Sequence, residues 1–291
     1  MTRTPVTVGT TLVLGATGTT GGRTAAQLTA AGHRVRAASR RAAPVPGAEP
    51  VPGAEPVPFD WYDPATHAAA LDGVDRVYLV PPVGDPDPAA VMMPFLRRAR
   101  SAARVRRAVL LSSSAVPAGG PGVGVVHQAL PDLFEEWAVL RPSWFMQNFT
   151  GAHAHAVSIR EDGVVLTATG SGRVGFVDAE DIAASAVCAL TDERAPNTDL
   201  VLTGPQALGY DDVATAIAEV TGRPVVHRRL SYEQMRDRLT AVLPVEFAAM
   251  LAGMDRAIAE GAEDRVTDTV QRLTGRPPST FRAFLEREVR R

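Results

Sequence analysis

The chain has 291 residues, of which 45% are apolar, and it carries 30 basic and 32 acidic side chains for a net charge of −2. This length allows one large domain or a large domain with a smaller lobe, and the charge balance argues against nucleic acid or an anionic membrane as a partner. All the basic residues counted there are arginine, so no lysine amine is available for a Schiff base, a P-loop or the tuning of a catalytic tyrosine.

The first 190 residues alternate short apolar runs with longer helical patterns, which is typical of a parallel sheet covered by helices on both faces. The expected strands are residues 11–14, 34–38, 57–59, 76–80, 108–111 and 137–140. The expected helices are residues 21–31, 65–71, 89–103 and 179–190. We therefore predict an α/β doubly wound parallel-sheet Rossmann fold, with an NAD(P)-binding domain over residues 1–190.

From residue 191 the pattern changes to a strand at 200–202, a helix that begins at Tyr210, a strand at 225–229 and then mostly helix, including 245–261. We expect residues 191–291 to form a smaller α+β lobe that binds the substrate, with contributions from 142–175. The hexapeptide PVPGAE occurs at 44–49 and again at 50–55. This period is too short for a solenoid, so we interpret it as a tandem duplication tolerated in a surface loop.

The strongest motif is the order apolar run, glycine turn and Ala-rich helix over residues 11–33. Gly15 permits a tight turn, Gly18 allows the backbone to approach a pyrophosphate, and Gly21 allows the helix to pack closely on the strand. The threonines of the same turn complete the predicted phosphate site: Thr17, Thr19 and Thr20. The alternative is a glycine-rich turn that has lost its nucleotide.

The end of the second strand indicates which dinucleotide is preferred. An NAD-selective site places an acidic residue here, but this chain has Ser39, Arg40 and Arg41. Guanidinium groups suit the 2′-phosphate of NADP(H), which we therefore prefer over NAD(H), although one of the two arginines alone could be a solvated loop edge. After the third strand, Asp60 and Trp61 are placed to border the adenine, while Asp60 could equally cap a turn.

Several segments together resemble the NmrA-like branch of the atypical short-chain dehydrogenases/reductases: GATGTTGG, ASRR, ALDGVDRVYLVPP, LLSSSA, LRPSWFMQNF and VDAEDIAASAVCAL. The resemblance covers about residues 10–230. It implies that the nicotinamide end of the cofactor is bordered by Val80, Pro81, Pro82, Ser112, Ser113 and Pro142. It also implies that Trp144 and Phe145 form a wall of the site. These segments could instead serve packing alone.

The chain departs from the usual proton-transfer groups of these enzymes. The Tyr-x-x-x-Lys pair cannot exist without lysine, and the family's histidine followed four residues later by Glu or Lys is here His127 followed by Pro131. His127 and Ser113 remain as candidate proton donors, with a structural role for His127 as the alternative. Such a site suits electrophiles that are already activated, because an iminium needs no proton and a quinone or enone leaves a stabilised oxyanion.

An aromatic and Met-rich group could line an apolar pocket, or could be core: Trp144, Phe145, Met146, Phe149, Phe247, Met250 and Met254. Of these, Trp144, Phe145, Phe149 and Met250 are the predicted substrate residues. The histidine spacing gives no metal site. We expect no nucleic acid or membrane partner, a monomer or homodimer, and, from the absence of a long apolar run or a convincing signal peptide, a cytoplasmic protein.

The leading hypothesis is an NADPH-dependent reductase of a small apolar or aromatic enone, quinone or imine, plausibly in specialised metabolism. The family also contains cofactor-sensing regulators without turnover, so a non-enzymatic NADP sensor is the second hypothesis. A third is a non-redox cyclase or isomerase that reuses the fold.

Overall fold

The computed structural model of the chain describes residues 9–40, 51–103 and 105–290. Its residues form two compact units, one made of residues 1–142 and 182–201 and the other of residues 143–181 and 202–291. This division differs from the expected boundary at residue 190, because the whole of 143–181 joins the second unit and 191–201 joins the first. Within the described ranges, no helix is both long enough and apolar enough to cross a membrane.

A seven-stranded sheet is the centre of the first unit. In chain order its strands are β1 (Thr10–Leu14), β2 (Arg34–Ser39), β3 (Glu55–Pro58), β4 (Arg76–Leu79), β5 (Arg107–Leu111), β6 (Glu136–Pro142) and β9 (Thr198–Leu202). They lie in the order β3-β2-β1-β4-β5-β6-β9, and every pairing from β3 to β6 is parallel. The order 3-2-1-4-5-6 is that of the dinucleotide-binding Rossmann fold, so the predicted fold class is confirmed.

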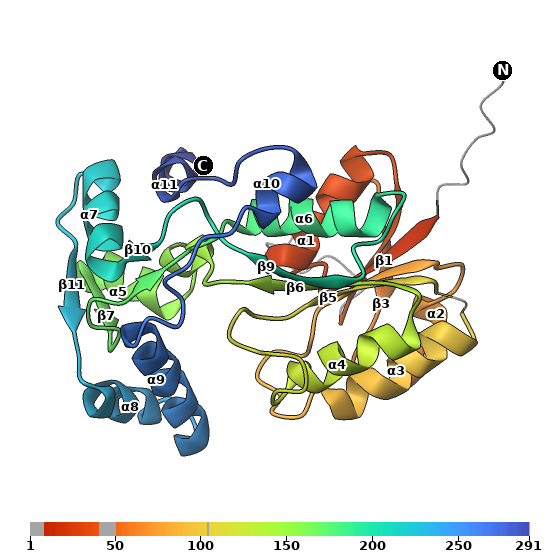
Figure 1. The fold of residues 1–291 in the computed structure, drawn as a ribbon, viewed down its shortest axis with the longest axis horizontal. Helices are drawn as coiled ribbons and strands as arrows, with labels where there is room; N and C mark the ends of the chain where they lie inside the picture. Colours follow the sequence, from red (N-terminus) through yellow and green to blue (C-terminus); the bar gives the residue numbers. More distant parts are fainter. Residues whose placement is uncertain (1–8, 41–50, 104, 291) are drawn as a thin grey trace. The chain divides into compact units, whose positions relative to one another are not determined.

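Five helices pack on this sheet: α1 (Thr19–Ala30), α2 (Ala65–Ala70), α3 (Ala89–Ser101), α4 (Val123–Leu133) and α6 (Ala179–Thr191). In Figure 1, α1 and α6 lie on one face and α2, α3 and α4 lie on the other. The central strands β1, β4 and β5 are buried on both faces, which is why they appear in the sequence as continuous apolar runs rather than alternating ones. The apolar core continues from the sheet into α3 and α4.

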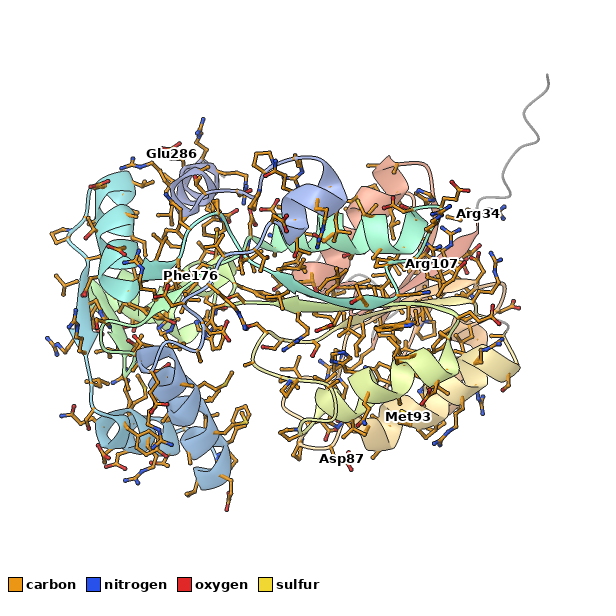
Figure 2. The ribbon with its side chains drawn as sticks, in the orientation of Figure 1. Arg34, Asp87, Met93, Arg107, Phe176 and Glu286 are labelled. Atoms are coloured by element: carbon orange, nitrogen blue, oxygen red, sulfur yellow. The ribbon has the colours of Figure 1, made fainter. Side chains whose placement is uncertain are left out.

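Arg107, labelled in Figure 2, fixes the end of α6 to the sheet. It begins β5 and is 2% exposed, and its Nε donates to Glu136 Oε2 at 2.8 Å. Its Nη1 donates to the carbonyls of Leu190 at 3.1 Å and Asp192 at 2.6 Å. A cation at a helix C-terminus satisfies carbonyls that have no partner inside the helix and opposes the negative end of the dipole.

The second unit combines short strands with helices. Its elements are η1 (Met146–Phe149), α5 (Ala154–Asp162), β7 (Val164–Thr167), β8 (Arg173–Val174), β10 (Leu208–Gly209), α7 (Tyr210–Thr221), β11 (Val226–Arg229), α8 (Tyr232–Thr240), α9 (Val245–Ala259), α10 (Thr269–Thr274) and α11 (Phe281–Val289). β7 pairs in parallel with β11, and β8 pairs antiparallel with β10. Phe176, labelled in Figure 2, lies in its core with Phe149, Tyr210 and Phe281.

Candidate functional site

The glycine turn lies where the strand order reverses, since β1 pairs with β2 on one side and with β4 on the other. Gly15 follows β1 with φ +64°, a conformation that favours glycine. A Cβ at this position would lie 3.3 Å from the Cβ of Val80, the residue that follows β4. The carboxyl ends of β1 and β4 therefore meet here, where doubly wound sheets bind their ligands.

The turn also leaves the start of α1 open. Gly18 is the N-cap residue, and its N–H donates to the carbonyl of Gly15 at 2.8 Å. A Cβ on Gly21 would lie 2.3 Å from that same carbonyl oxygen, so only glycine fits. No side chain caps α1, and its first turn has no acidic residue. The first-turn N–H groups of this helix are thus free for an anion such as a pyrophosphate.

The three predicted threonines differ in exposure. Thr17 and Thr19 are exposed on the turn, whereas Thr20 is buried against the sheet. The hydroxyls of Thr17 and Thr19 are therefore the accessible ones beside the open helix start.

Ser39 and Arg40 continue directly from β2 beside the glycine turn. The register pairs Leu14 of β1 with Ala38 of β2, and the Ala16 N–H donates to the Ala38 carbonyl at 3.0 Å. Ser39 is half-buried and Arg40 is exposed. Arg41 and most of the PVPGAE repeat lie outside the described residues.

Asp60 and Trp61 follow β3, but the structure gives them roles in a turn and in the core. Asp60 Oδ1 accepts the N–H of Tyr62 at 3.0 Å, the geometry of a carboxylate that caps a turn. Trp61 is 9% exposed and packs edge-on against Phe59 and Phe95. Its Nε1 donates to the Val80 carbonyl at 3.0 Å. The Trp61 ring therefore packs in the core and holds the end of β4, and its contact with the adenine stays a prediction.

The ends of β4 and β5 bring the expected nicotinamide-side residues to one edge of the sheet. Val80, Pro81 and Pro82 are half-buried after β4. After β5, the Ser112 N–H donates to the Leu140 carbonyl at 2.7 Å, and its Oγ is buried without a hydrogen-bond partner in the described structure. Ser113 Oγ accepts the Ala115 N–H at 3.3 Å within a turn. Ser112 Oγ is thus a buried hydroxyl of this loop that has no hydrogen-bond partner among the described residues.

Arg141 holds the loop that follows β5, a role that the sequence did not reveal. Its guanidinium donates to the Ser114 carbonyl at 2.9 Å and pairs with Asp199 Oδ2 at 2.6 Å. The Ser114 N–H donates in turn to the carbonyl of Pro142 at 2.9 Å. The strand pair β5 and β6 therefore fixes the serine loop through backbone groups.

Neither His127 nor Tyr78 has the properties of an efficient proton donor. His127 lies on α4, is 5% exposed, and its Nδ1 has no hydrogen-bond partner among the described residues. Burial holds the pKa of His127 below its ordinary value, so the ring is neutral at pH 7. Tyr78 is fully buried on β4, and burial raises its pKa to about 12.

The second unit contains an apolar cavity of about 530 Å³. The lining residues come from η1, α5, α7, α8 and α9 and from the adjoining segments: Trp144, Asn148, His153, Ala154, His155, Ser158, Leu166, Tyr210, Met235, Arg238, Leu239, Val242, Leu243, Leu251, Met254 and Asp255. Its size and apolar walls are those of a small-molecule site. Sequence reasoning found Trp144 and Met254 but missed the residues that α8 contributes to this wall.

The other predicted substrate residues lie elsewhere in this unit. Phe149 is buried in the aromatic core, where its ring stacks on His155 with centroids 5.6 Å apart. Phe145 is half-buried and forms a backbone bridge with Val177. Met250 is half-exposed on α9 and does not line the cavity. Helical spacing placed Met250 and Met254 on one face, but only Met254 reaches the cavity.

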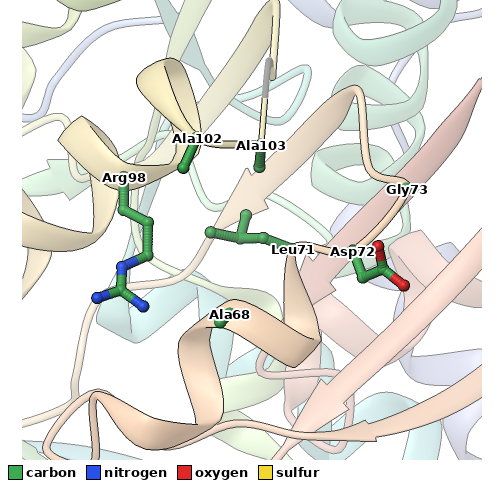
Figure 3. Close-up of a pocket in the computed structure, with 7 residues that line it drawn as sticks. All are labelled: Ala68, Leu71, Asp72, Gly73, Arg98, Ala102 and Ala103. Atoms are coloured by element: carbon green, nitrogen blue, oxygen red, sulfur yellow. The ribbon is translucent and has the colours of Figure 1, made fainter.

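A further hollow of about 370 Å³ occurs in the first unit between the ends of α2 and α3 (Figure 3). It is lined by Ala68, Leu71, Asp72, Gly73, Arg98, Ala102 and Ala103. These residues precede β4 and β5, so the hollow lies at the amino ends of the strands, whereas the glycine turn is at the carboxyl ends. It is therefore separate from the candidate site. The described residues include no group of three or more His, Cys, Asp or Glu side chains that could hold a metal ion.

The fold and the glycine turn define a dinucleotide-binding protein, and comparison with known proteins agrees. Residues 15–136 match the family of NAD(P)H-binding domains. The chain is 43% identical to the uncharacterised oxidoreductase YesF of Bacillus subtilis, over 94% of this chain and 93% of that protein. It is 35% identical to festuclavine synthase II of Penicillium roqueforti, over 96% of this chain and 98% of that protein.

Among solved structures, the NADPH-dependent quinone oxidoreductase QOR2 of Escherichia coli in complex with NADPH has a TM-score of 0.79 at 22% identity. The match covers 96% of this chain and 99% of that one. The chain belongs to the NmrA-like family of atypical short-chain dehydrogenases/reductases, and it is an oxidoreductase with an NAD(P)H-binding domain.

Proposed function

We propose that the protein is an NADPH-dependent reductase of small conjugated or aromatic electrophiles. The observation that carries the proposal is the glycine turn, where a Cβ on Gly21 would meet backbone and the start of α1 has neither cap nor acid. These features fit the pyrophosphate of a dinucleotide, because backbone N–H groups and the helix dipole bind an anion. Side chains in place of the glycines would keep the anion away from these groups.

The preference for NADPH rests on the residues after β2. Arg40 is exposed there, beside the glycine turn, and no carboxylate occupies the position where one would bind the ribose of NAD. A guanidinium binds phosphate oxygens through a planar fork and stays charged at any physiological pH. Ser39 adds a hydroxyl at the same place.

The choice of electrophile rests on what the chain cannot do. A ketone reduction needs a proton as the alkoxide forms, but this chain has no lysine, His127 is buried and neutral, and Tyr78 is fully buried. The bound cofactor supplies a hydride. An iminium carbon that accepts it becomes a neutral amine without a proton, and a quinone or enone gives a stabilised oxyanion. We propose that the Ser112 hydroxyl, which has no hydrogen-bond partner among the described residues, donates to such an oxygen.

Relatives that share about a third or more of their residues with this chain support a reductase. They include the oxidoreductase YesF at 43% identity, agroclavine dehydrogenase of Claviceps fusiformis at 38% and the NAD(P)H azoreductase of Xenophilus azovorans at 33%. The substrates in these names do not transfer to this chain.

The test is a titration of the purified protein with NADPH and NADH, followed by a quinone, a conjugated enone and a cyclic iminium, with loss of the reduced nicotinamide absorbance as the readout. We expect NADPH to bind more tightly than NADH and to be consumed with at least one electrophile. Tight binding of NADPH without consumption by any of them would instead support the sensor, which the buried His127 favours. Failure of both cofactors to bind would refute the proposal.

A further inference from the structure

The cavity of the second unit contains one carboxylate among its lining residues, Asp255 on α9. Asp255 is half-buried, and its Oδ2 accepts the backbone N–H of Ala168 at 2.7 Å. Within the described part of the chain no arginine or histidine lies within ion-pair distance of it. Burial raises the pKa of this carboxyl, since its charge is poorly compensated. An unpaired carboxylate in an apolar wall costs stability, which marks a candidate for function.

The other titratable groups that line the cavity do not supply the missing charge. Burial lowers the pKa of His153, and it lowers the pKa of His155 to about 3. Both rings are therefore neutral at pH 7. Burial and the nearby Asp255 charge raise the pKa of Tyr210. Arg238, the one cation on the lining, is exposed on α8 and therefore solvated. Asp255 is thus left as the anionic group of the cavity.

The rest of the wall suits a ring system. Leu239, Leu251 and Met254 present apolar side chains from α8 and α9, and Trp144 presents an aromatic ring. The Ser158 hydroxyl of α5 is buried and has no hydrogen-bond partner in the described structure. A cavity of about 530 Å³ accepts a molecule of drug-like size.

We propose that this cavity binds a cationic, mainly apolar ring compound of the iminium or protonated-amine class, and that Asp255 provides its counter-charge. The inference rests on the proposed function in one respect: an iminium is the electrophile whose reduction needs no proton. Asp255 is then a specificity-determining residue, because neutral rings of the same size would leave its charge unpaired.

The test compares two probes of nearly equal size, 2-methylisoquinolinium, which is cationic, and 2-methylisoquinolin-1-one, which is neutral. Binding to the full-length protein is measured by isothermal titration calorimetry at pH 7.5 without cofactor, so the result does not depend on turnover. We expect the cation to bind about tenfold to a hundredfold more tightly than the neutral ring. Equal affinities, or a preference for the neutral ring, would overturn the proposal.

Three variants locate the effect. Asp255→Asn keeps an oxygen for the Ala168 N–H and should remove the preference for the cation while leaving neutral binding unchanged. Glu246→Gln, which removes an exposed carboxylate from the same helix, is the matched control and should change neither affinity. Leu251→Trp fills the cavity and should weaken both probes. A cation preference that survives both Asp255→Asn and Leu251→Trp would mean that the cation binds elsewhere, which refutes the assignment.

The outcomes also separate this inference from the proposed function. Consumption of NADPH with quinones but no cation preference would leave the reductase standing and reject the role of Asp255. A cation preference that depends on Asp255, without consumption of NADPH by any electrophile, would support the cavity and reject the reductase.

Discussion

Gly21 leaves no room for a side chain at the start of α1, and this makes it a sharp test of the glycine turn. In Gly21→Ala the new Cβ would meet the Gly15 carbonyl, so α1 must shift away from β1. We expect a loss of about 1–3 kcal/mol in the free energy of unfolding and at least about tenfold weaker NADPH binding. Urea unfolding and a fluorescence titration measure the two effects.

Gly253→Ala is the control for Gly21→Ala. A Cβ at Gly253 has no neighbour within 4 Å in α9, so alanine should stabilise that helix by about 0.5–1 kcal/mol. Equal effects of the two substitutions on the free energy of unfolding and on NADPH binding would contradict the role of the tight contact at Gly21.

Arg40 determines the choice between NADPH and NADH if the guanidinium binds the 2′-phosphate. Arg40→Ala should weaken NADPH binding by about tenfold or more and leave NADH binding almost unchanged, because only NADPH carries that phosphate. Arg34→Ala removes an equally exposed arginine from the other end of β2 and should affect neither cofactor. The ratio of the two dissociation constants is the measurement, and an unchanged ratio in Arg40→Ala would contradict the assignment.

Residue patterns identified the glycine turn because its chemistry is local: strand, turn and helix follow one another within about 20 residues. Trp61 shows the limit of such patterns. Its position after β3 suggested the adenine but could not reveal the contact with Phe95 of α3, which packs the ring in the core. Asp255 gave no sequence signal, because its significance comes from an apolar cavity formed by several elements.

At the level of elements, α11 is anchored to the second unit by an ion pair between a half-buried arginine and a buried aspartate. Arg287 Nη2 donates to Asp178 Oδ2 at 2.7 Å, and Asp178 is fully buried. Asp178 Oδ1 also accepts from Gln147 Nε2 at 2.8 Å and from the Glu180 N–H at 3.1 Å. Within the second unit, the Asp178 carboxylate thus binds three partners: Gln147, the Glu180 N–H and Arg287.

Removal of Arg287 should therefore be costly. Arg287→Met leaves the buried Asp178 charge without its cation, and we expect a loss of about 3 kcal/mol in the free energy of unfolding. Arg290→Met breaks only an exposed contact with Glu286 at the end of the same helix and should cost less than about 0.5 kcal/mol. Chemical denaturation of the two variants side by side makes the comparison, and similar losses would show that the pair with Asp178 adds nothing.

The strands and helices of the first unit were largely predictable because its central strands β1, β4 and β5 are apolar runs buried on both faces. α4 was not predicted because Gly124 and Pro131 interrupt its helical pattern. Burial of Val126, His127 and Leu130 stabilises the helix in spite of these two residues. The two-residue strands β8 and β10 were not predicted either. Elements this short carry too few residues for a period to be detected, and they form because their partners are brought together by other contacts.

The stability of the whole molecule should fall in mild acid. Burial lowers the pKa of five histidines, so the folded chain binds fewer protons than the unfolded chain in mild acid: His33, His127, His153, His155 and His227. Their contribution to stability is fully present above the ordinary pKa of 6.5 and is lost as the pH falls below it. The window extends down to about 3 because of His155.

We therefore expect the urea midpoint to fall between pH 7.5 and pH 5. His155→Gln, whose side chain does not titrate, should show a smaller fall, although its midpoint at pH 7.5 is expected to be somewhat lower through the lost stacking on Phe149. An equal fall in both proteins would show that His155 is not responsible.

The division of the chain into units has a consequence for synthesis. The chain crosses between the two units three times, and β9 at the edge of the sheet follows α5, β7 and β8 of the second unit. On a ribosome, the Rossmann sheet therefore cannot be completed until residues 143–181 of the second unit have been made. No single cut of the gene yields either unit intact, and a circular permutation alone would not separate them. Expression of the first unit by itself would require an artificial linker in place of residues 143–181, and expression of the second unit would require one in place of residues 182–201.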